Sequence, residues 1–286
     1  MTAPARRGPV PPAAEQAPMP RELLVFEGAR QVRDHDIVIV GTGLPLLAGL
    51  VAQRTHAPDA RLVIESGSVF PTVKPTPLSV VDPRLMNRPS RLGSLLEVLG
   101  GFVQRGIVTT GFLGGAQIDA RANINSTWVS RGEGRVRLPG SGGANDIASH
   151  CRTVVVLTSH EKRRFPQRCD YVTSPGFLDG PGARRRAGLG PLTVKVITDL
   201  CVMEGDDETG ELTVTALMPG AGLDDVAAAT GFAITAAGEP RTVTPPTEKE
   251  LRLLRHTLDP ECRYFPERKL NTHPNGSNPE HGGHHD

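Results

Sequence analysis

The chain has 286 residues, of which 38% are hydrophobic and 22% charged, and its formal net charge is +1. This size and balance are typical of a globular protein with a sizeable core, and the near-zero charge argues against a nucleic-acid partner. An aromatic content of 4% also argues against a platform that stacks single-stranded bases.

The two ends of the chain have compositions that predict disorder. Residues 1–20 are rich in Pro and Ala without periodicity, and residues 269–286 are polar and contain several histidines. Those histidines are compatible with a metal site, although a solvated tail is the commoner meaning of such a stretch, and we predict no metal site. We therefore expect one domain over residues 21–268.

The chain also carries signals about its compartment. No apolar run approaches the length of a membrane span, and the N-terminus lacks the apolar centre of a signal peptide. The four cysteines are widely spaced with no Cys-x-x-Cys pair, which favours free thiols over disulfides or metal ligands. We expect a cytoplasmic protein without membrane contact.

Apolar runs alternate with helix-like segments between the two tails. Strands are predicted at residues 36–40, 62–64, 107–113, 151–157, 193–198 and 211–217. Helices are predicted at residues 44–55, 94–103, 223–230 and 247–258, the last opening on a Thr247–Glu250 capping box. Such alternation predicts an α/β fold with an open, largely parallel sheet covered by helices.

One carboxylate comes directly after a short buried strand. The apolar run at residues 62–64 precedes Glu65, and a turn signal follows at Ser66 and Gly67. In open α/β sheets, ligands bind at the carboxyl ends of the strands, which would put Glu65 at the mouth of a cleft. Taken alone, a surface or strand-capping glutamate is the commoner case.

Three glycine-rich segments follow predicted strands. Gly41 and Gly43 precede a helix and would expose N–H groups to an anion, but they lack the remaining residues of a dinucleotide or Walker motif, so taken alone a plain tight turn is the commoner case. The Gly114–Gly115 pair permits close approach of a ligand and would turn an N–H group toward a developing oxyanion, unless it is simply a strand end. Residues 140–146 contain three glycines before a helix-like segment, as anion-binding nests do.

A fourth segment is basic. Residues 161–165 read Glu-Lys-Arg-Arg-Phe, and a turn-rich stretch follows at residues 170–177. A basic cluster is usually a solvated surface, whereas its functional interpretation is a patch for a phosphate- or carboxylate-bearing ligand.

Taken in order, these segments resemble the β subunit of family I coenzyme A transferases, especially the glutaconate and 3-oxoadipate CoA-transferase group. The resemblance covers about residues 21–264. It rests on the strings VGTGLP, APDARLVIESG, GFLGGAQID, NINST, RLPGSGGANDIA, EKRRF, DYVTSPGFLDGPG and VITDLCVME. It implies a three-layer α/β/α domain.

The resemblance also implies a mechanism. Glu65 would attack an acyl-CoA thioester, giving an acyl–glutamyl anhydride and then a glutamyl–CoA thioester, with ping-pong kinetics. Because a carboxylate is normally ionised at neutral pH, such a nucleophile needs no general base. A backbone N–H of Gly114 or Gly115 would stabilise the oxyanion. Contacts to substrate or CoA are expected at Gly41, Gly43, Gln117, Asn125, Ser126, Thr127, Gly142, Gly143, Ala144, Asn145 and Ser174.

The resemblance further implies what the enzyme works with. No tightly bound cofactor is expected, because coenzyme A is a substrate. The implied partner is an α subunit, in a heterodimer or a multiple of it, since the G-x-G-G-F stretch associated with CoA in that subunit has only a relative here, at residues 140–144. One departure is Ala122, where the family often carries Gly before the Asn.

Two other functions stay open on the sequence alone. The same scaffold with CoA could hydrolyse thioesters or cleave and decarboxylate a C–C bond, and the same sheet could serve a non-enzymatic ligand sensor. Retention of Glu65 favours transfer, because relatives that lost this residue are hydrolases or decarboxylases. The acid pair, of glutaconate or 3-oxoadipate type, is not specified by these motifs.

Overall fold

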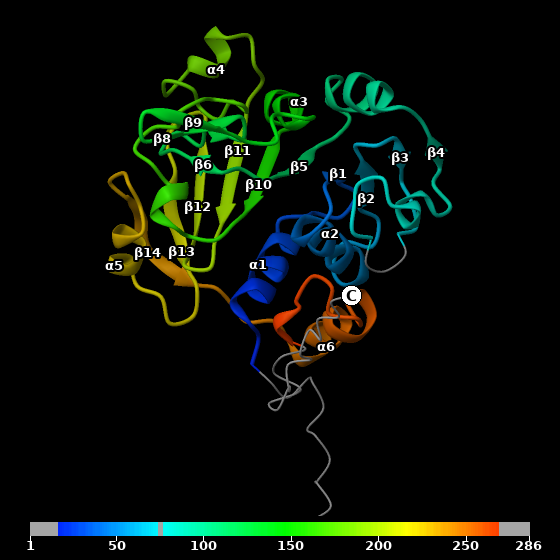
Figure 1. The fold of residues 1–286 in the computed structure, drawn as a ribbon. Helices are drawn as coiled ribbons and strands as arrows, with labels where there is room; N and C mark the ends of the chain where they lie inside the picture. Colours follow the sequence, from blue (N-terminus) through cyan, green and yellow to red (C-terminus); the bar gives the residue numbers. More distant parts are fainter. Residues whose placement is uncertain (1–16, 74–76, 269–286) are drawn as a thin grey trace, which may run out of the picture.

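The computed structural model describes residues 17–73 and 77–268, arranged around one large sheet (Figure 1). Most of the predicted N-terminal tail and all of the predicted C-terminal tail, with its histidines, lie outside the described residues. The first helix, α1, begins at Pro20, the last residue of the predicted tail.

The sheet has ten strands in the order β14-β13-β12-β11-β10-β5-β1-β2-β3-β4. The five strands from β11 to β2 all run parallel, whereas most of the outer pairs are antiparallel. This confirms the predicted open, largely parallel α/β sheet. The strands are β1 Ile37–Val40, β2 Arg61–Ile64, β3 Ser68–Val69, β4 Arg91–Leu92, β5 Thr110–Leu113, β10 Thr153–Leu157, β11 Thr193–Ile197, β12 Cys201–Asp206, β13 Thr213–Leu217 and β14 Ala236–Thr242.

Helices cover both faces of the sheet. On one face lie α1 Pro20–Ala29, α2 Leu44–Arg54 and α6 Glu248–Arg252, the last continuing as a π-helix to Leu258; on the other lie α3 Ala144–His150 and a π-helical segment, Glu97–Val103 (Figure 1). The strands alternate between the two resulting cores. Val38 and Val40 pack on the first face and Ile39 on the second, as the two-residue period of a strand requires.

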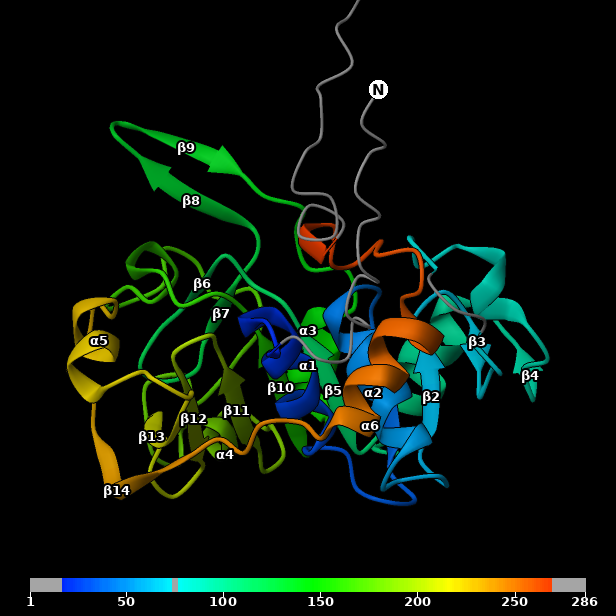
Figure 2. The same cartoon turned by 90° about the horizontal axis from the view of Figure 1, so that it is seen from below.

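Shorter elements complete the described chain. The turns of helix are Pro83–Met86, Lys162–Arg164, α4 Ala183–Arg186 and α5 Leu223–Ala228. Two small antiparallel pairs are β6 Gln117–Ile118 with β7 Ile124–Asn125, and β8 Trp128–Arg131 with β9 Gly134–Arg137. The β8–β9 hairpin projects from the body of the molecule (Figure 2).

Helix α1 and strand β12 were not predicted. The acidic side chains of Glu22 and Glu27 in α1 are fully buried and pair with the distant Arg255 and Arg241 respectively, so the helix lacks the usual polar face. Strand β12 follows β11 through a short turn and pairs with it antiparallel, without the helix that the strand–helix alternation led us to expect.

None of the helices in the described ranges combines the length and the apolar character that crossing a bilayer requires.

One buried arginine connects several loops on the second face. The guanidinium of Arg184, only 2% exposed, lies 3.7 Å from the Asp207 carboxylate. It also donates hydrogen bonds to five backbone carbonyls, those of Ala148, Ser149, Pro175, Gly176 and Gly190. It thereby ties the end of α3 to the two loops that flank α4.

Replacing this arginine should destabilise the fold. In Arg184→Met the carbonyls lose their donor while staying buried, so we expect the free energy of unfolding to fall by about 3 kcal/mol or more. Urea unfolding measures the loss. Arg185→Met removes an exposed neighbour and should change stability little. Equal stability of the two variants would contradict this assignment.

Candidate active site

The parallel strands bring three of the predicted site segments to one edge of the sheet. Glu65 follows β2, Gly41 follows β1 and Gly114 follows β5, and β1 lies between the other two strands. Two strand spacings separate the ends of β2 and β5, which is about 10 Å. The edge is the one at which open parallel sheets bind ligands.

The Glu65 carboxylate meets the third glycine-rich segment. Gly143 donates its N–H to Glu65 Oε1 at 3.1 Å, across 78 residues of sequence, and Glu65 itself is half-buried. A Cβ on Gly143 would lie 3.2 Å from the Glu65 carboxyl carbon and 2.8 Å from a Leu99 methyl. Glycine at this position therefore permits the close approach between backbone and carboxylate.

The turn after Glu65 is held from the other side. Gly67 has φ +115°, and a Cβ there would lie 2.1 Å from the carbonyl oxygen of Gly93. The N–H of Gly93 donates to the Gly67 carbonyl. The Ser66 hydroxyl donates to the Val80 carbonyl at 2.6 Å. These contacts fix the direction in which the chain leaves Glu65.

The Gly114–Gly115 pair combines an open position with a tightly packed one. A Cβ on Gly114, which is exposed, would meet no atom within 4 Å, whereas one on Gly115 would lie 2.3 Å from an Ile124 methyl. Arg164 Nη1 donates to the Gly115 carbonyl at 3.3 Å. The pair thus presents backbone on its open side and is packed on the other.

The Gly41–Gly43 turn lies beside Tyr264. Gly43 has φ +93° and caps α2, and the Tyr264 hydroxyl donates to the Pro77 carbonyl. Burial raises the pKa of Tyr264 to about 12, so its hydroxyl stays protonated. A Cβ on Gly41 would meet no atom within 4 Å, which leaves that glycine as the open one.

The predicted polar contacts on the β6–β7 segment are directed at one another. Asn125 is fully buried and donates through Nδ2 to Gln117 Oε1 and to the Trp128 carbonyl, each at 2.7 Å. Gln117 also accepts from the backbone of Asp170 and donates to its carboxylate. These two amides hold the loops together, a role that the sequence did not separate from substrate binding.

The neighbouring hydroxyls support the loop that reaches Glu65. Ser126 Oγ donates to the Gly140 carbonyl at 2.7 Å, and Thr127 Oγ1 lies 2.7 Å from Thr173 Oγ1. Asn145, exposed in the first turn of α3, donates through Nδ2 to the Thr173 carbonyl at 2.9 Å. The Ser126 and Asn145 contacts hold the two ends of the segment that contains Gly142, Gly143 and Ala144.

Ser174 differs from these residues. Its backbone bridges to Ile124, but its buried hydroxyl has no hydrogen-bond partner within the described ranges. None of Gln117, Asn125, Ser126, Thr127 and Ser174 bonds directly to Glu65 there, where the Gly143 N–H is the carboxylate's one hydrogen-bond donor.

Sequence reasoning missed a buried histidine at the same sheet edge. His160, 7% exposed, follows β10; its Nδ1 lies 2.9 Å from Thr198 Oγ1 and its Nε2 lies 3.0 Å from Thr230 Oγ1. Its ring stacks on Phe165 with centroids 4.3 Å apart. The one available signal was its position directly before the basic Glu-Lys-Arg-Arg-Phe stretch. Stacking of His160 on Phe165 joins the two ends of the turn that this stretch forms.

The comparisons with known proteins show the family of the chain. A family model described as "Coenzyme A transferase" matches residues 27–229. The chain belongs to the coenzyme A transferase family. The resemblance seen in the sequence is thereby confirmed, and the enzyme is favoured over the non-enzymatic sensor.

Relatives match this transferase over most of its length. It is 35% identical to the B subunit of glutaconate CoA-transferase from Acidaminococcus fermentans, over 84% of this chain and 92% of that protein. It is 37% identical to the B subunit of 3-oxoadipate CoA-transferase from Pseudomonas knackmussii, over 82% and 91%. Both relatives are thus B subunits of CoA-transferases.

Solved structures give the same picture. The crystal structure of glutaconate CoA-transferase from Acidaminococcus fermentans matches with a TM-score of 0.80 at 34% identity, covering 86% of this chain and 97% of that one. The decarboxylase AibA/AibB matches less well, with a TM-score of 0.73 at 26% identity over 86% and 97%. The transferase is thus the nearer of these two structures in both shape and sequence.

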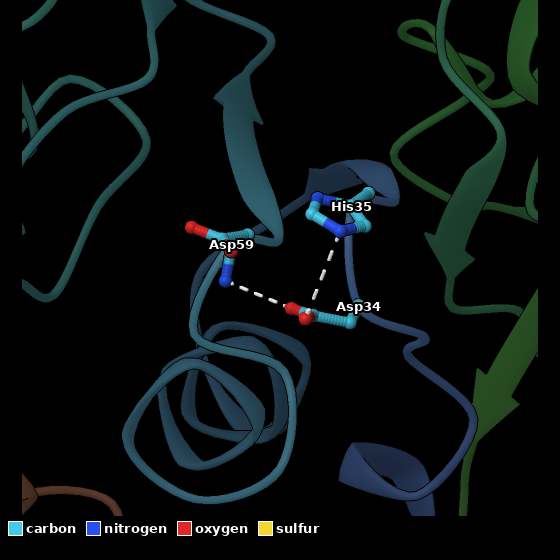
Figure 3. Close-up of side chains that lie close together, drawn as sticks. All are labelled: Asp34, His35 and Asp59. Carbon is cyan, nitrogen blue, oxygen red and sulfur yellow. Dashed lines mark hydrogen bonds and ion pairs between the residues drawn. The ribbon is translucent and has the colours of Figure 1, made fainter.

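The transferase also carries an exposed acidic cluster away from this edge. Atoms of Asp34, His35 and Asp59 that could ligate a metal lie within 4.8 Å of one another (Figure 3). Asp34 Oδ1 accepts the Asp59 N–H at 2.8 Å, and its Oδ2 lies 4.0 Å from His35 Nε2. Because these residues precede β1 and β2, they lie at the opposite edge of the sheet from Glu65.

The cysteines of the transferase are all free thiols. Burial raises the pKa of Cys151 and of Cys201 to about 12 and raises that of Cys169 still further. Thiols that stay protonated are poor nucleophiles, so these three do not compete with a carboxylate for an acyl group.

His160 should make the fold sensitive to mild acid. Burial lowers the pKa of His160 to about 4, below the 6.5 of an exposed histidine. In that pH window the unfolded chain binds a proton that the folded chain excludes, so this stability is complete above the higher value and is lost as the pH falls.

We expect the free energy of unfolding to drop by about 2 kcal/mol through His160 alone between about pH 7.5 and about pH 5. Urea unfolding at both pH values should show a smaller drop in His160→Gln. His256→Gln, at an exposed histidine, should match the unaltered chain. The same pH dependence in both variants would refute a neutral, buried His160.

Proposed function

We propose that this chain is the nucleophile-bearing subunit of a two-subunit CoA-transferase, with Glu65 as the nucleophile. The observation that carries the proposal is the half-buried Glu65 carboxylate at the carboxyl edge of the sheet, oriented by the Gly143 N–H. Partial burial supports the role, because a carboxylate is a weak nucleophile when fully hydrated.

The proposed chemistry needs no further protein nucleophile. A Glu65 oxygen attacks the thioester carbonyl; the C–S bond breaks, CoA leaves as a thiolate, and an acyl–glutamyl anhydride remains. The thiolate then attacks the glutamyl carbon of the anhydride, which releases the first acid as its carboxylate and leaves a glutamyl–CoA thioester. A second carboxylate reverses both steps and departs as the new acyl-CoA.

The glycines would serve the charge that develops during these steps. The Gly114–Gly115 backbone is open toward solvent beside the sheet edge, where an N–H group would stabilise an oxyanion. Gly143 bonds to the nucleophile itself and would fix which lone pair faces the thioester. Gly41, Gly142, Ala144 and Asn145 would contribute backbone or amide contacts to CoA or the acid.

The substrate class follows from the relatives. Glutaconate and 3-oxoadipate, the acids in the names of these two relatives, both carry two carboxylates, so a short dicarboxylic or 3-oxo acid is the proposed substrate. Coenzyme A acts as a substrate with no tightly bound cofactor, the partner is an α subunit in a heterodimer or a multiple of it, and the enzyme works in the cytoplasm.

A trapping experiment tests the nucleophile. With its partner subunit and acyl-CoA alone, followed by borohydride, the enzyme should be reduced at Glu65 to an alcohol that peptide mass spectrometry detects. Glu65→Gln should lose the label and at least about 10³-fold of the transfer rate. The matched control Glu133→Gln, in the exposed hairpin turn, should keep both.

Transfer at an unaltered rate in Glu65→Gln would refute the assignment. Product formation without any acceptor acid would instead indicate the hydrolase or decarboxylase alternative on the same scaffold.

A further inference from the structure

A hollow of about 540 Å³ lies between the projecting β8–β9 hairpin and the basic turn at residues 162–164. Its apolar wall includes Val129, Val136 and Leu138, and its cationic wall is formed by Arg131, Arg163 and Arg164. An alkyl chain that ends in an anion has both of the properties that such a lining complements.

The charge of this hollow sets it apart from other hollows in the described chain. Its lining contains three arginines and no aspartate or glutamate. Four other hollows in the same ranges each have at least one carboxylate in the wall beside their arginines. Glu161, outside this lining, pairs with Arg163 and Arg164, so Arg131 is the arginine of the wall whose charge a ligand carboxylate would neutralise.

The hairpin directs only some of its side chains into the hollow. In an antiparallel pair, residues directly opposite share a face, and Val129 pairs with Val136 while Ser130 pairs with Arg135. Arg131, two residues after Val129, lies on the hollow-lining face. Arg135 lies on the other face, where its guanidinium stacks 4.2 Å from the Trp128 ring centre.

The opposite wall includes Ala116 and adjoins the Gly114–Gly115 pair through Arg164. Arg164 donates through Nη1 to the Gly115 carbonyl and lies 3.4 Å through Nε from Glu161 Oε1, which leaves Nη2 without a hydrogen bond to the described chain. Its side chain is 30% exposed. Stacking of His160 on Phe165 fixes the base of this turn. The hollow therefore begins next to the predicted oxyanion glycines.

Competing carboxylates near the hollow are already occupied. Glu161 accepts from Ser159, Arg163 and Arg164, and these hydrogen bonds lower the pKa of Glu161 to about 2. Asp170 accepts from Gln117 and from the Ser130 backbone. The Arg131 side chain forms no ion pair with any described residue and projects from the exposed end of β8.

We infer that this hollow receives the second carboxylate of a dicarboxylic acid substrate, with Arg131 and Arg164 as the specificity-determining residues. The inference rests on the proposed function, in which Glu65 takes the acyl group beside the Gly114–Gly115 pair. The reacting carbonyl lies at the glycines, the carbon chain lies along Val129, Val136 and Leu138, and the distant carboxylate meets the guanidinium groups. The phosphate groups of CoA are the other anions that such a wall would bind.

Matched acids separate these possibilities. The complete two-subunit enzyme is assayed with acetyl-CoA and two acid pairs that differ by one carboxylate: glutaconate against pent-2-enoate, and 3-oxoadipate against 3-oxohexanoate. In Arg131→Gln and Arg164→Gln, the ratio of kcat/KM for diacid to monoacid should fall about tenfold or more, the usual loss for a charge-assisted contact. Arg164→Lys keeps the charge and should restore part of the ratio.

The control and the contrary outcomes are defined by the same assay. Arg135→Gln removes one charge from the other face of the same hairpin and should leave the ratio unchanged. A higher KM for acetyl-CoA with equal losses for both acids would assign the hollow to CoA phosphate and overturn the inference. An unchanged ratio with active transfer would overturn only this inference, whereas an absence of transfer with every acid would count against the proposed function as well.

Discussion

The contact between the Gly143 N–H and the Glu65 carboxylate is the constraint on which the site depends. It joins the end of β2, a strand of the sheet, to the start of α3, a helix on the second face of the sheet. A side chain at residue 143 would force the loop away from the carboxylate and from Leu99. The candidate site thus depends on the absence of a side chain at Gly143, and the surrounding polar residues hold this loop in place.

The supporting network explains why so many short polar residues gather near the site. Ser126 bonds to Gly140, Thr127 lies against Thr173, and Asn145 bonds to the Thr173 carbonyl. Each contact joins segments that are far apart in sequence, so the loop position is determined by the folded core and not by local turn preferences. In the proposed mechanism such preorganisation would favour catalysis, because the donors would not need to move during the reaction.

Sequence alone was sufficient for features that depend on local patterns. The apolar runs of β1, β2, β10 and β11 and the capping box at Thr247 were all placed close to their observed positions. The position of Glu65 at a strand end followed from the same patterns. Ala122 was identified as a departure from the family pattern, and the structure gives it φ +56°, a backbone conformation in which glycine is the less strained residue.

Features that depend on distant partners were not predictable. Glu22 and Glu27 look like surface residues until Arg255 and Arg241 are placed beside them. Gln117 was predicted as a substrate contact, and the structure adds hydrogen bonds from its amide to Asp170, 53 residues away. In each case one polar group is read differently once its long-range partner is known.

The Tyr264 hydroxyl has a consequence for the architecture of the mouth of the site. It donates to the Pro77 carbonyl across 187 residues and lies beside Gly43, so the last described segment forms part of the boundary next to α2. The end of the described chain therefore packs back against its first third. Removing the end of the chain up to and including this tyrosine would remove the Tyr264–Pro77 contact beside the first glycine turn. All ten strands of the sheet would still be retained.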